Sequence, residues 1–328
     1  MARDLIITNG KSAGGSIRAT GIADEYLIWG EALYVGPVPL TPDLPSLSRI
    51  RAEYWDERKP GGREEVFDSF VERDSSLLNA GVFDRVVIWA GHEIIEQLAL
   101  IQILDYFAEN SMDDNELYLL QADDCLGIQN REQIFQLQGT EKKVTQAQLE
   151  LARKAWTSFR QPTPEAFVGL LSEILSALPN LKPTIKRILQ ELPSANGITR
   201  IQKQILFMLD KKPMQPASCC GRTLILDDFN FLGDLIFFEI FWNLAKCQAP
   251  LIFTEDKLPV GAWPFQEKEV RNDFYGAQFQ LTDLGRAVLN GEEDFAKFND
   301  FHFWWGGTEI TKDNLWRWDD IEGRLSCS

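Results

Sequence analysis

The residues of this chain best suited to chemistry come directly after four short apolar segments. The first segment leads into "TNGKS", which supplies Thr8, Asn9, Gly10, Lys11 and Ser12. The loops after the other three carry Gly30 and Glu31, then Gly91, His92 and Glu93, then Gln121, Asp123 and Asp124. Hydroxyl, amide and ammonium groups bind anions, whereas imidazole and carboxylate groups transfer protons. We therefore expect a small anionic ligand at these loops, with His92 and Asp123 as catalytic candidates. The expected ligand contacts are Thr8, Asn9, Gly10, Lys11, Ser12, Glu31, Glu93 and Gln121.

These side chains can meet only if the apolar segments lie in one sheet. Fully apolar runs bounded by polar residues predict strands buried on both faces at Leu5–Thr8, Tyr26–Trp29, Val86–Trp89 and Leu117–Leu120. Helical spacing of Ile94, Leu98 and Ile101 predicts a crossover helix, and another is expected over residues 63–78. Strands alternating with helices predict an open, Rossmann-like parallel sheet over residues 1–128, and ligands bind such sheets beyond the carboxyl ends of the strands.

The opening loop has two interpretations. A helix that starts after Gly10 would direct backbone N–H groups at an anion, and Lys11 favours this interpretation. Alternatively, Asn9-Gly10 is a common turn pair, Ser12 or Ser16 caps the helix, and the following glycine pair only permits close approach or a positive φ. The stretch matches neither the P-loop nor the G-x-G-x-x-G fingerprint, so both interpretations stay open.

The other candidates have structural alternatives as well. His92 suits a general base or metal ligand, or is a loop histidine satisfied by one hydrogen bond. Asp123 and Asp124 are adjacent and project in different directions, so at most one of them faces the site. Arg51 and Trp55 share one helical face and either clamp a planar or anionic group or pack against each other. The stretch "GPVPLTPDLPSL" predicts a stiff loop that walls the pocket.

Composition limits the classes of function. The chain has 328 residues, 25% of them charged, and a net charge of −16. This length fits about two globular domains. The negative charge argues against nucleic acid and anionic membranes as partners. Five cysteines without C-x-x-C spacing suggest neither disulfides nor zinc, and no metal site is expected. The opening "MARDLIITNG" lacks the pattern of a signal peptide, so we expect a cytoplasmic protein.

Beyond residue 128 the pattern changes. Residues 129–195 are expected to form a helical bridge, with a capping box at Thr145 and Gln148 and a second helix capped by Thr163. Residues 196–328 follow the order of a winged helix: a helix capped by Thr199, the long apolar segment 231–247, the strand-like "PLIFT", and "QFQLTDLGRAVLNG". An aromatic C-terminal segment follows, in which His302 is expected to be packed.

The charge of this last part argues for contact with protein. The segment that would read DNA carries Lys246 as its basic residue, opposed by Asp234 and Glu239. Residues 195–328 contain 14 basic and 20 acidic residues. A winged-helix-like domain that binds a protein partner therefore fits better than one that binds DNA.

The landmarks "ITNGKSA", "GPVP", "QADDCLG", "GRAVLNG", "WWGG" and "WRWD" occur in order over nearly the full chain. In this the chain resembles a bacterial family of uncharacterised proteins, catalogued as a domain of unknown function, with its C-terminal extension. The resemblance implies a cytosolic bacterial protein and supplies no reaction or cofactor. Two departures change the acidic groups: Lys11 stands where the family usually has Asp, and Gly91-His92-Glu93 stands where it usually has Glu-His-Asp.

Three functions follow as hypotheses. The first is a binding protein or enzyme for a small phosphorylated or nucleotide-like molecule at the strand ends. The second is a protein-interaction module without catalysis, and the third is a ligand-responsive DNA-binding regulator, which the charge disfavours. The ligand, the cofactor and the reaction are not determined by the sequence.

Overall fold

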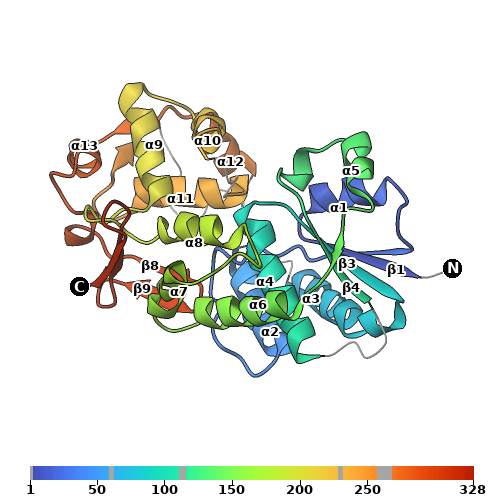
Figure 1. Ribbon diagram of the computed structural model, residues 1–328. Coiled ribbons are helices and arrows are strands. Elements are labelled where there is room, and N and C mark those ends of the chain that lie inside the picture. Colours follow the sequence, from blue (N-terminus) through green and yellow to red (C-terminus); the bar gives the residue numbers. More distant parts are fainter. Residues whose placement is uncertain (1–2, 59–62, 111–115, 228–231, 257–267) are drawn as a thin grey trace. The chain divides into compact units, whose positions relative to one another are not determined.

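The computed structural model describes residues 3–58, 63–110, 116–227, 232–256 and 268–328 (Figure 1). The chain forms two compact units. Unit 1 comprises residues 1–186 and 304–308, and unit 2 comprises residues 187–303 and 309–328. The domain boundaries expected at residues 128 and 195 are statements about which parts of the chain fold independently. They remain predictions.

A mostly parallel sheet is the centre of unit 1. Its strands are β1 (Asp4–Thr8), β2 (Glu25–Ile28), β3 (Arg85–Ala90), β4 (Glu116–Gln121) and β5 (Lys142–Lys143). The order is β2-β1-β3-β4-β5, in which β1 to β4 are parallel and β5 is antiparallel to β4. All four strands expected from the apolar runs are present, so the mixed α/β class with a largely parallel sheet is confirmed.

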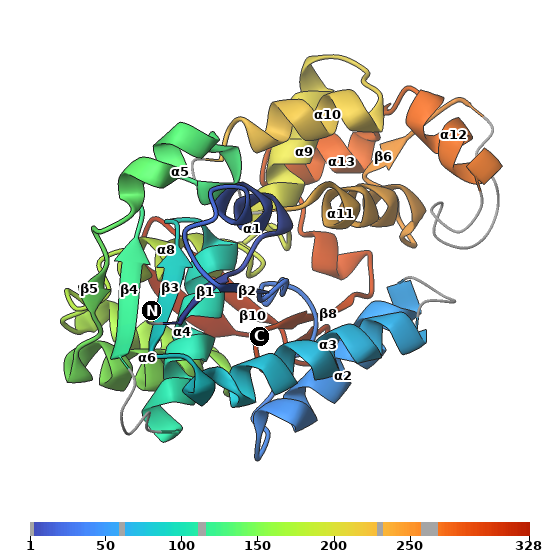
Figure 2. The same cartoon turned by 90° about the vertical axis from the view of Figure 1, so that its right-hand side faces the viewer.

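The helices of unit 1 connect and cover these strands. Their bounds are α1 (Lys11–Arg18), α2 (Leu44–Arg58), α3 (Arg63–Leu78), α4 (Ile94–Glu109), α5 (Arg131–Leu137), α6 (Gln146–Phe159) and α7 (Glu165–Gly169), with 3-10 turns at Ala80–Val82, Leu126–Ile128 and Leu170–Ser172. Helices α2 and α3 run side by side (Figure 2). Helix α8 (Leu181–Leu189) follows. The capping box of Thr145 and Gln148 is present at α6, whereas α7 begins from Pro164 rather than Thr163 because the Thr163 hydroxyl donates to the Glu165 carboxylate.

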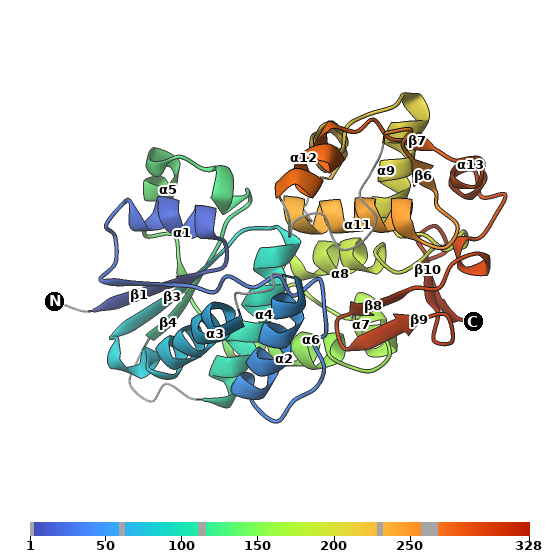
Figure 3. The ribbon, with the colours of Figure 1, turned by 180° about the vertical axis from the view of Figure 1, so that it is seen from behind.

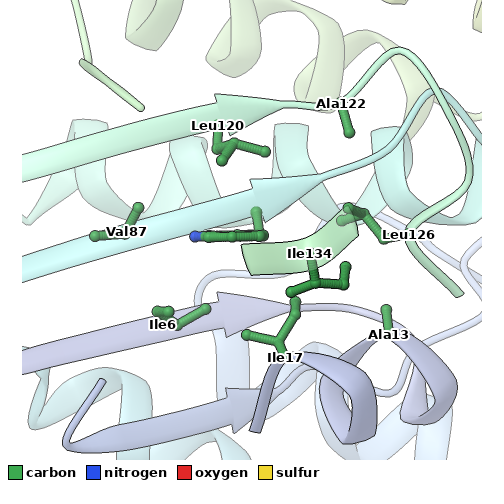
Figure 4. Packing of buried hydrophobic residues seen from close by; sticks show 9 residues of the cluster. Ile6, Ala13, Ile17, Val87, Leu120, Ala122, Leu126 and Ile134 are labelled. Atoms are coloured by element: carbon green, nitrogen blue, oxygen red, sulfur yellow. The ribbon is translucent and has the colours of Figure 1, made fainter. Parts of the chain in front are cut away.

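Helices cover both faces of the sheet (Figure 3). On one face, Ala13 and Ile17 of α1 pack with Ile134 of α5 against alternate residues of the strands, including Ile6 and Val87 (Figure 4). This is the period-two alternation of a strand, which sends neighbouring side chains to opposite faces. Helix α4 covers the other face and is itself covered by α6. Consequently its polar residues Gln97 and Gln102, which the helical pattern had placed away from the apolar face, are also buried.

Unit 2 is built from helices and short antiparallel strand pairs. Its helices are α9 (Arg200–Lys211), α10 (Pro216–Leu224), α11 (Asp234–Lys246), α12 (Lys268–Gly276) and α13 (Asp283–Leu289). Strand β6 (Ile252–Phe253) pairs with β7 (Gln280–Leu281), and β10 (Trp316–Asp319) pairs with β11 (Arg324–Cys327). The expected cap of α9 by Thr199 and Gln202 is present. Part of the expected excursion between β6 and β7, residues 257–267, lies outside the described residues.

The remaining strands, β8 (His302–Trp305) and β9 (Thr308–Thr311), pair with each other. His302 is exposed, and its Nε2 lies 2.8 Å from Glu309 Oε1, so the expectation of a packed histidine was wrong. Side chains of a strand alternate between its two faces, so His302 and Trp305, three residues apart, lie on opposite faces of β8. Trp305 is buried and contacts Phe159 and Phe167 within unit 1. The "WRWD" strand buries Trp316 and Trp318 in unit 2.

The two adjacent glycines of α1 provide a test of how closely this helix approaches the sheet. A Cβ on Gly14 would lie 2.6 Å from the Ile28 side chain, whereas one on Gly15 would meet nothing within 4 Å. Both substitutions bring the same gain in helix propensity. We therefore expect Gly14→Ala to be less stable than Gly15→Ala by about 1–3 kcal/mol, the cost of overpacking, as measured by urea denaturation. Equal stabilities would contradict this close contact.

Candidate functional site

The strand order identifies where a ligand would bind. In the order β2-β1-β3-β4, the chain leaves β1 toward one edge of the sheet and β3 toward the other, with α1 and α4 on opposite faces. Such a reversal leaves a crevice beyond the carboxyl ends of the two central strands. The candidate site is therefore where the first turns of α1 and α4 meet, beyond Thr8 and Ala90.

Helix α1 contributes a helix N-terminus and two exposed side chains. Gly10 is its N-cap and has no side chain to cap it, while Lys11 and Ser12 are exposed. Neither Ser12 nor Ser16 caps this helix, because both lie inside it. The first N–H groups of a helix have no intrahelical partner and carry partial positive charge. Lys11 adds a full positive charge at the same end.

The Thr8 side chain packs beneath this helix. Thr8 is 3% exposed, and its methyl group is 3.6 Å from where a Cβ of Gly14 would stand. Within the described part of the chain, its Oγ1 has no hydrogen-bond partner. A buried hydroxyl without a partner is costly, and such groups occur at sites that bind water or ligand.

Helix α4 contributes a buried carboxyl group, Glu96, which the sequence analysis did not select. Glu96 is 3% exposed, and its Oε1 accepts a hydrogen bond from the Gly10 backbone N–H at 3.3 Å. Burial raises the pKa of Glu96 to about 7, and the nearby Glu93 carboxylate adds to this rise. Glu93 and Glu96 are three residues apart at the start of a helix and thus share a face, a spacing visible in the sequence.

Glu93 interacts with the loop after β4. It is the N-cap residue of α4, is 7% exposed and accepts a hydrogen bond from the Cys125 thiol. Burial, with this hydrogen bond, raises the pKa of Cys125 to about 11. A thiol with so high a pKa is not a nucleophile near neutral pH. Cys125 therefore links two loops of the site and is not its reactive group.

Asn9, expected to bind ligand, instead joins three segments of the backbone. It is 2% exposed; its amide donates to the carbonyls of Glu31 and Ile95, both at 3.0 Å, and its Oδ1 accepts from the Glu31 N–H at 2.9 Å. Its hydrogen-bonding capacity is thus used in holding the loops after β1 and β2 to the start of α4. Asn9 fixes the geometry of the site.

Glu31 and Arg51, also expected to bind ligand, form a buried ion pair. Arg51 Nη2 is 2.8 Å from Glu31 Oε1, both side chains are 1% exposed, and Arg73 lies 3.5 Å from the other oxygen. Burial alone would raise the pKa of Glu31, but Arg51 and Arg73 outweigh it, so the pKa is lowered. The expected binding of an external anion by Arg51 is not supported, because the Arg51 guanidinium already donates hydrogen bonds to Glu31 and to backbone carbonyls.

Arg51 also shapes the proline-rich loop. It donates to the carbonyls of Val35 at 2.5 Å and Ala32 at 3.0 Å, and its guanidinium carbon is 5.9 Å from the centre of the Trp55 ring. Gly36 adopts a φ of 73° and faces the Tyr54 ring, where a Cβ would approach to 2.6 Å. Packing between Arg51 and Trp55, the structural alternative, agrees with this geometry.

The remaining candidates lie beyond β3 and β4. His92 is half-buried just before α4, and Gln121, the last residue of β4, pairs in register with Ala90 of β3. The Gln121 side chain is partly buried, and among the described residues its Oε1 has no hydrogen-bond partner. Asp123 and Asp124 are both exposed. Their convergence with Lys11 and His92 on one ligand remains a prediction.

In comparisons with known proteins, no family model and no curated protein matches the chain. Across the described residues, no group of three or more histidine, cysteine or acidic side chains is placed to hold a metal ion. A search of the same residues finds no helix that is long and apolar enough to cross a membrane.

The buried pair of Glu31 and Arg51 yields a stability prediction. Replacing Arg51 by Met would leave Glu31 charged and buried with weaker compensation, which costs about 3–5 kcal/mol in comparable pairs. Arg49→Met, on the exposed face of the same helix, should change the free energy of unfolding by about 0.5 kcal/mol or less. Urea denaturation measures both. A loss below about 1 kcal/mol for Arg51→Met would show that the pair does not support the loops.

Glu96 yields a prediction on pH. The unfolded chain has a Glu pKa near 4.5 and the folded site about 7, so between these values the folded protein retains a proton that the unfolded chain has released. The contribution of Glu96 to the free energy of unfolding therefore falls as pH rises through this window and is constant above it. Relative to Glu96→Gln, the wild type should lose about 3 kcal/mol between about pH 5 and pH 8.

The control for this measurement is Glu132→Gln, at an exposed position on α5. It should follow the wild type at every pH in urea denaturation. Parallel curves for the wild type and Glu96→Gln would mean that the Glu96 carboxyl titrates normally.

Proposed function

We propose that unit 1 binds a small phosphorylated molecule where α1 and α4 meet, and that Glu96 exchanges a proton with it. The observation that carries this proposal is the hydrogen bond from Gly10 N–H to Glu96 Oε1 at the point where the strand order reverses. It places an anion-attracting helix end next to a buried carboxyl group. Lys11 supplies positive charge, and the Thr8 hydroxyl is the buried donor beneath the helix.

The two carboxyl groups make this binding depend on pH. A phosphate at the start of α1 is repelled by Glu93 and, once it ionises, by Glu96. In its neutral form Glu96 instead presents an O–H group that can donate to the anion or protonate a leaving group. Binding is therefore strongest when Glu96 is protonated, and by linkage a bound anion raises the pKa of Glu96 further.

This proposal assigns different roles to the residues selected from the sequence. Lys11, Ser12 and Thr8 contact the ligand, with Gln121 at the adjacent strand end. Asn9, Glu31 and Arg51 hold the loops. His92 and Asp123 remain proposed catalytic residues that act with Glu96, and no cofactor follows from their types.

The test is calorimetric titration with adenosine monophosphate, glucose 6-phosphate and inorganic phosphate. We expect at least one to bind, with affinity about tenfold lower at pH 8 than at pH 6 because Glu96 ionises in between. Lys11→Ala should weaken binding about tenfold, whereas Arg18→Ala, exposed at the other end of the same helix, should not. Glu96→Gln should abolish the pH dependence.

Two outcomes would overturn this assignment. One is that none of the three compounds binds. The other is that Lys11→Ala and Arg18→Ala behave alike, which would remove the start of α1 from the site. The series is measured in a variant that also carries Lys212→Gln and Arg222→Gln. These two exposed cations at the ends of α9 and α10 in unit 2 attract anions as well, and their removal leaves the contribution of unit 1.

For unit 2 we propose a winged-helix-like domain that serves protein contact. Three helices, α9, α10 and α11, followed by the β6–β7 pair support it, with α12 inserted between the two strands. The antiparallel bridge between Met214 and Phe279 adds a third strand position beside β7. Asp234 and Glu239 on α11 disfavour phosphate backbones. Retention of DNA in a gel shift at low salt would favour the ligand-responsive regulator instead.

The family assignment is also a proposal. The ordered landmarks from "ITNGKSA" to "WRWD" support membership in the uncharacterised bacterial family, and with it a cytoplasmic location. That support comes from sequence resemblance alone.

A further inference from the structure

Unit 2 contains a cavity that is separate from the strand-end site of unit 1. Its volume is about 300 Å³, and it lies between the carboxyl ends of α9 and α10. The described residues that line it are Met208, Lys211, Lys212, Met214, Arg222 and Ile225. Three of these six are cations and none is acidic.

The cations lie at the ends of two neighbouring helices. Lys211 is the last residue of α9, Lys212 follows it, and Arg222 lies in the last turn of α10. The nearest acid in sequence, Asp210, pairs with Arg286, and Asp227, just beyond Ile225, pairs with Arg187. Both acids therefore have arginine partners that do not line the cavity, and Arg187 also pairs with Glu191. Among the described residues, none of the three cations of the lining forms an ion pair with an acidic side chain, so an anion in the cavity would meet their positive charge.

The rest of the lining is apolar. Met208 and Met214 are buried at 6% and 5% exposure, whereas Ile225 is 83% exposed at the rim. Methionine is flexible and polarizable and adapts to ligands of different shape. The Lys211 ammonium lies 4.0 Å from the centre of the Phe207 ring, which restrains the charge next to this apolar surface.

Stabilisation of the helix ends explains only part of this arrangement. Cations near helix carboxyl ends interact favourably with the terminal carbonyls, which accounts for Lys211 and Arg222 on their own helices. It does not account for two helix ends placing their cations around one hollow with a methionine floor. Small-molecule sites combine a mostly apolar lining with a few convergent polar groups, and their volumes begin at about 300 Å³.

We propose that this cavity binds an amphipathic organic anion, with a phosphate or carboxylate head group held by Lys211, Lys212 and Arg222 and an alkyl or aryl part lying on Met208, Met214 and Ile225. The fork of Arg222 suits two oxygens of one head group, and the lysines act as point charges. The site goes beyond the proposed function of unit 1 and does not depend on it.

The test is calorimetric titration with octyl phosphate, kept below its micelle-forming concentration, in a Lys11→Ala background that removes the ligand contact of unit 1. Inorganic phosphate and octanol serve as the two halves of the probe. We expect octyl phosphate to bind at least tenfold more tightly than either half. Lys212→Gln/Arg222→Gln should weaken it about tenfold or more.

Two further variants separate this site from general charge effects. Lys203→Gln, exposed on the same helix but not lining the cavity, should leave the affinity unchanged. Ile225→Ser should weaken octyl phosphate and leave inorganic phosphate unaffected, and its exposure makes it tolerable to folding.

The proposal is overturned if octyl phosphate does not bind, if Lys203→Gln weakens it as much as the double variant, or if octanol binds equally well. The unit 1 site is tested in the Lys212→Gln/Arg222→Gln variant and the unit 2 site in the Lys11→Ala variant. Failure of one proposal therefore leaves the other intact.

Discussion

The buried carboxylate of Glu31 is the group on which the geometry of unit 1 depends. A charge removed from water is tolerated only when its partners restore the lost interactions, and Glu31 has Arg51 and Arg73 together with the Ala32 N–H at 3.0 Å. Because Arg51 also binds carbonyls of the proline-rich loop, one ion pair fixes the loop after β2 and attaches α2 and α3 to it.

Through Asn9, that constraint reaches the candidate site. The Asn9 side chain bonds to both backbone groups of Glu31 and to Ile95, so the loop after β1 has one position relative to α4. Gly10 follows directly, and its N–H then meets Glu96. Three polar residues that appeared suited to a ligand are thus used for internal hydrogen bonds. The site keeps the exposed Lys11 and Ser12, the buried Thr8 hydroxyl, and a carboxyl group that titrates near neutrality.

Charge is distributed unevenly in this acidic protein. Long-range repulsion from a net charge of −16 opposes the approach of any anion, so anion binding requires local arrangements that overcome it. In our proposals, the start of α1 does so with backbone N–H groups and a neutral Glu96, and the cavity of unit 2 does so with three cations. We therefore propose different ligands for the two sites: a compact phosphate ester in unit 1 and an amphipathic anion in unit 2.

The sequence by itself determined the strands, the main helices of unit 1 and the edge at which polar residues gather, because apolar runs, helical spacing and capping boxes are local patterns. It did not distinguish a residue that binds a ligand from one that binds its own chain. Asn9, Glu31 and Arg51 have side chains suited to either role, and only tertiary packing filled their hydrogen-bonding positions from within. The same packing decided the state of Glu96. The loop after β1 contacts this carboxyl group beside Glu93, and burial, which depends on contacts far apart in the chain, raised its pKa to about 7.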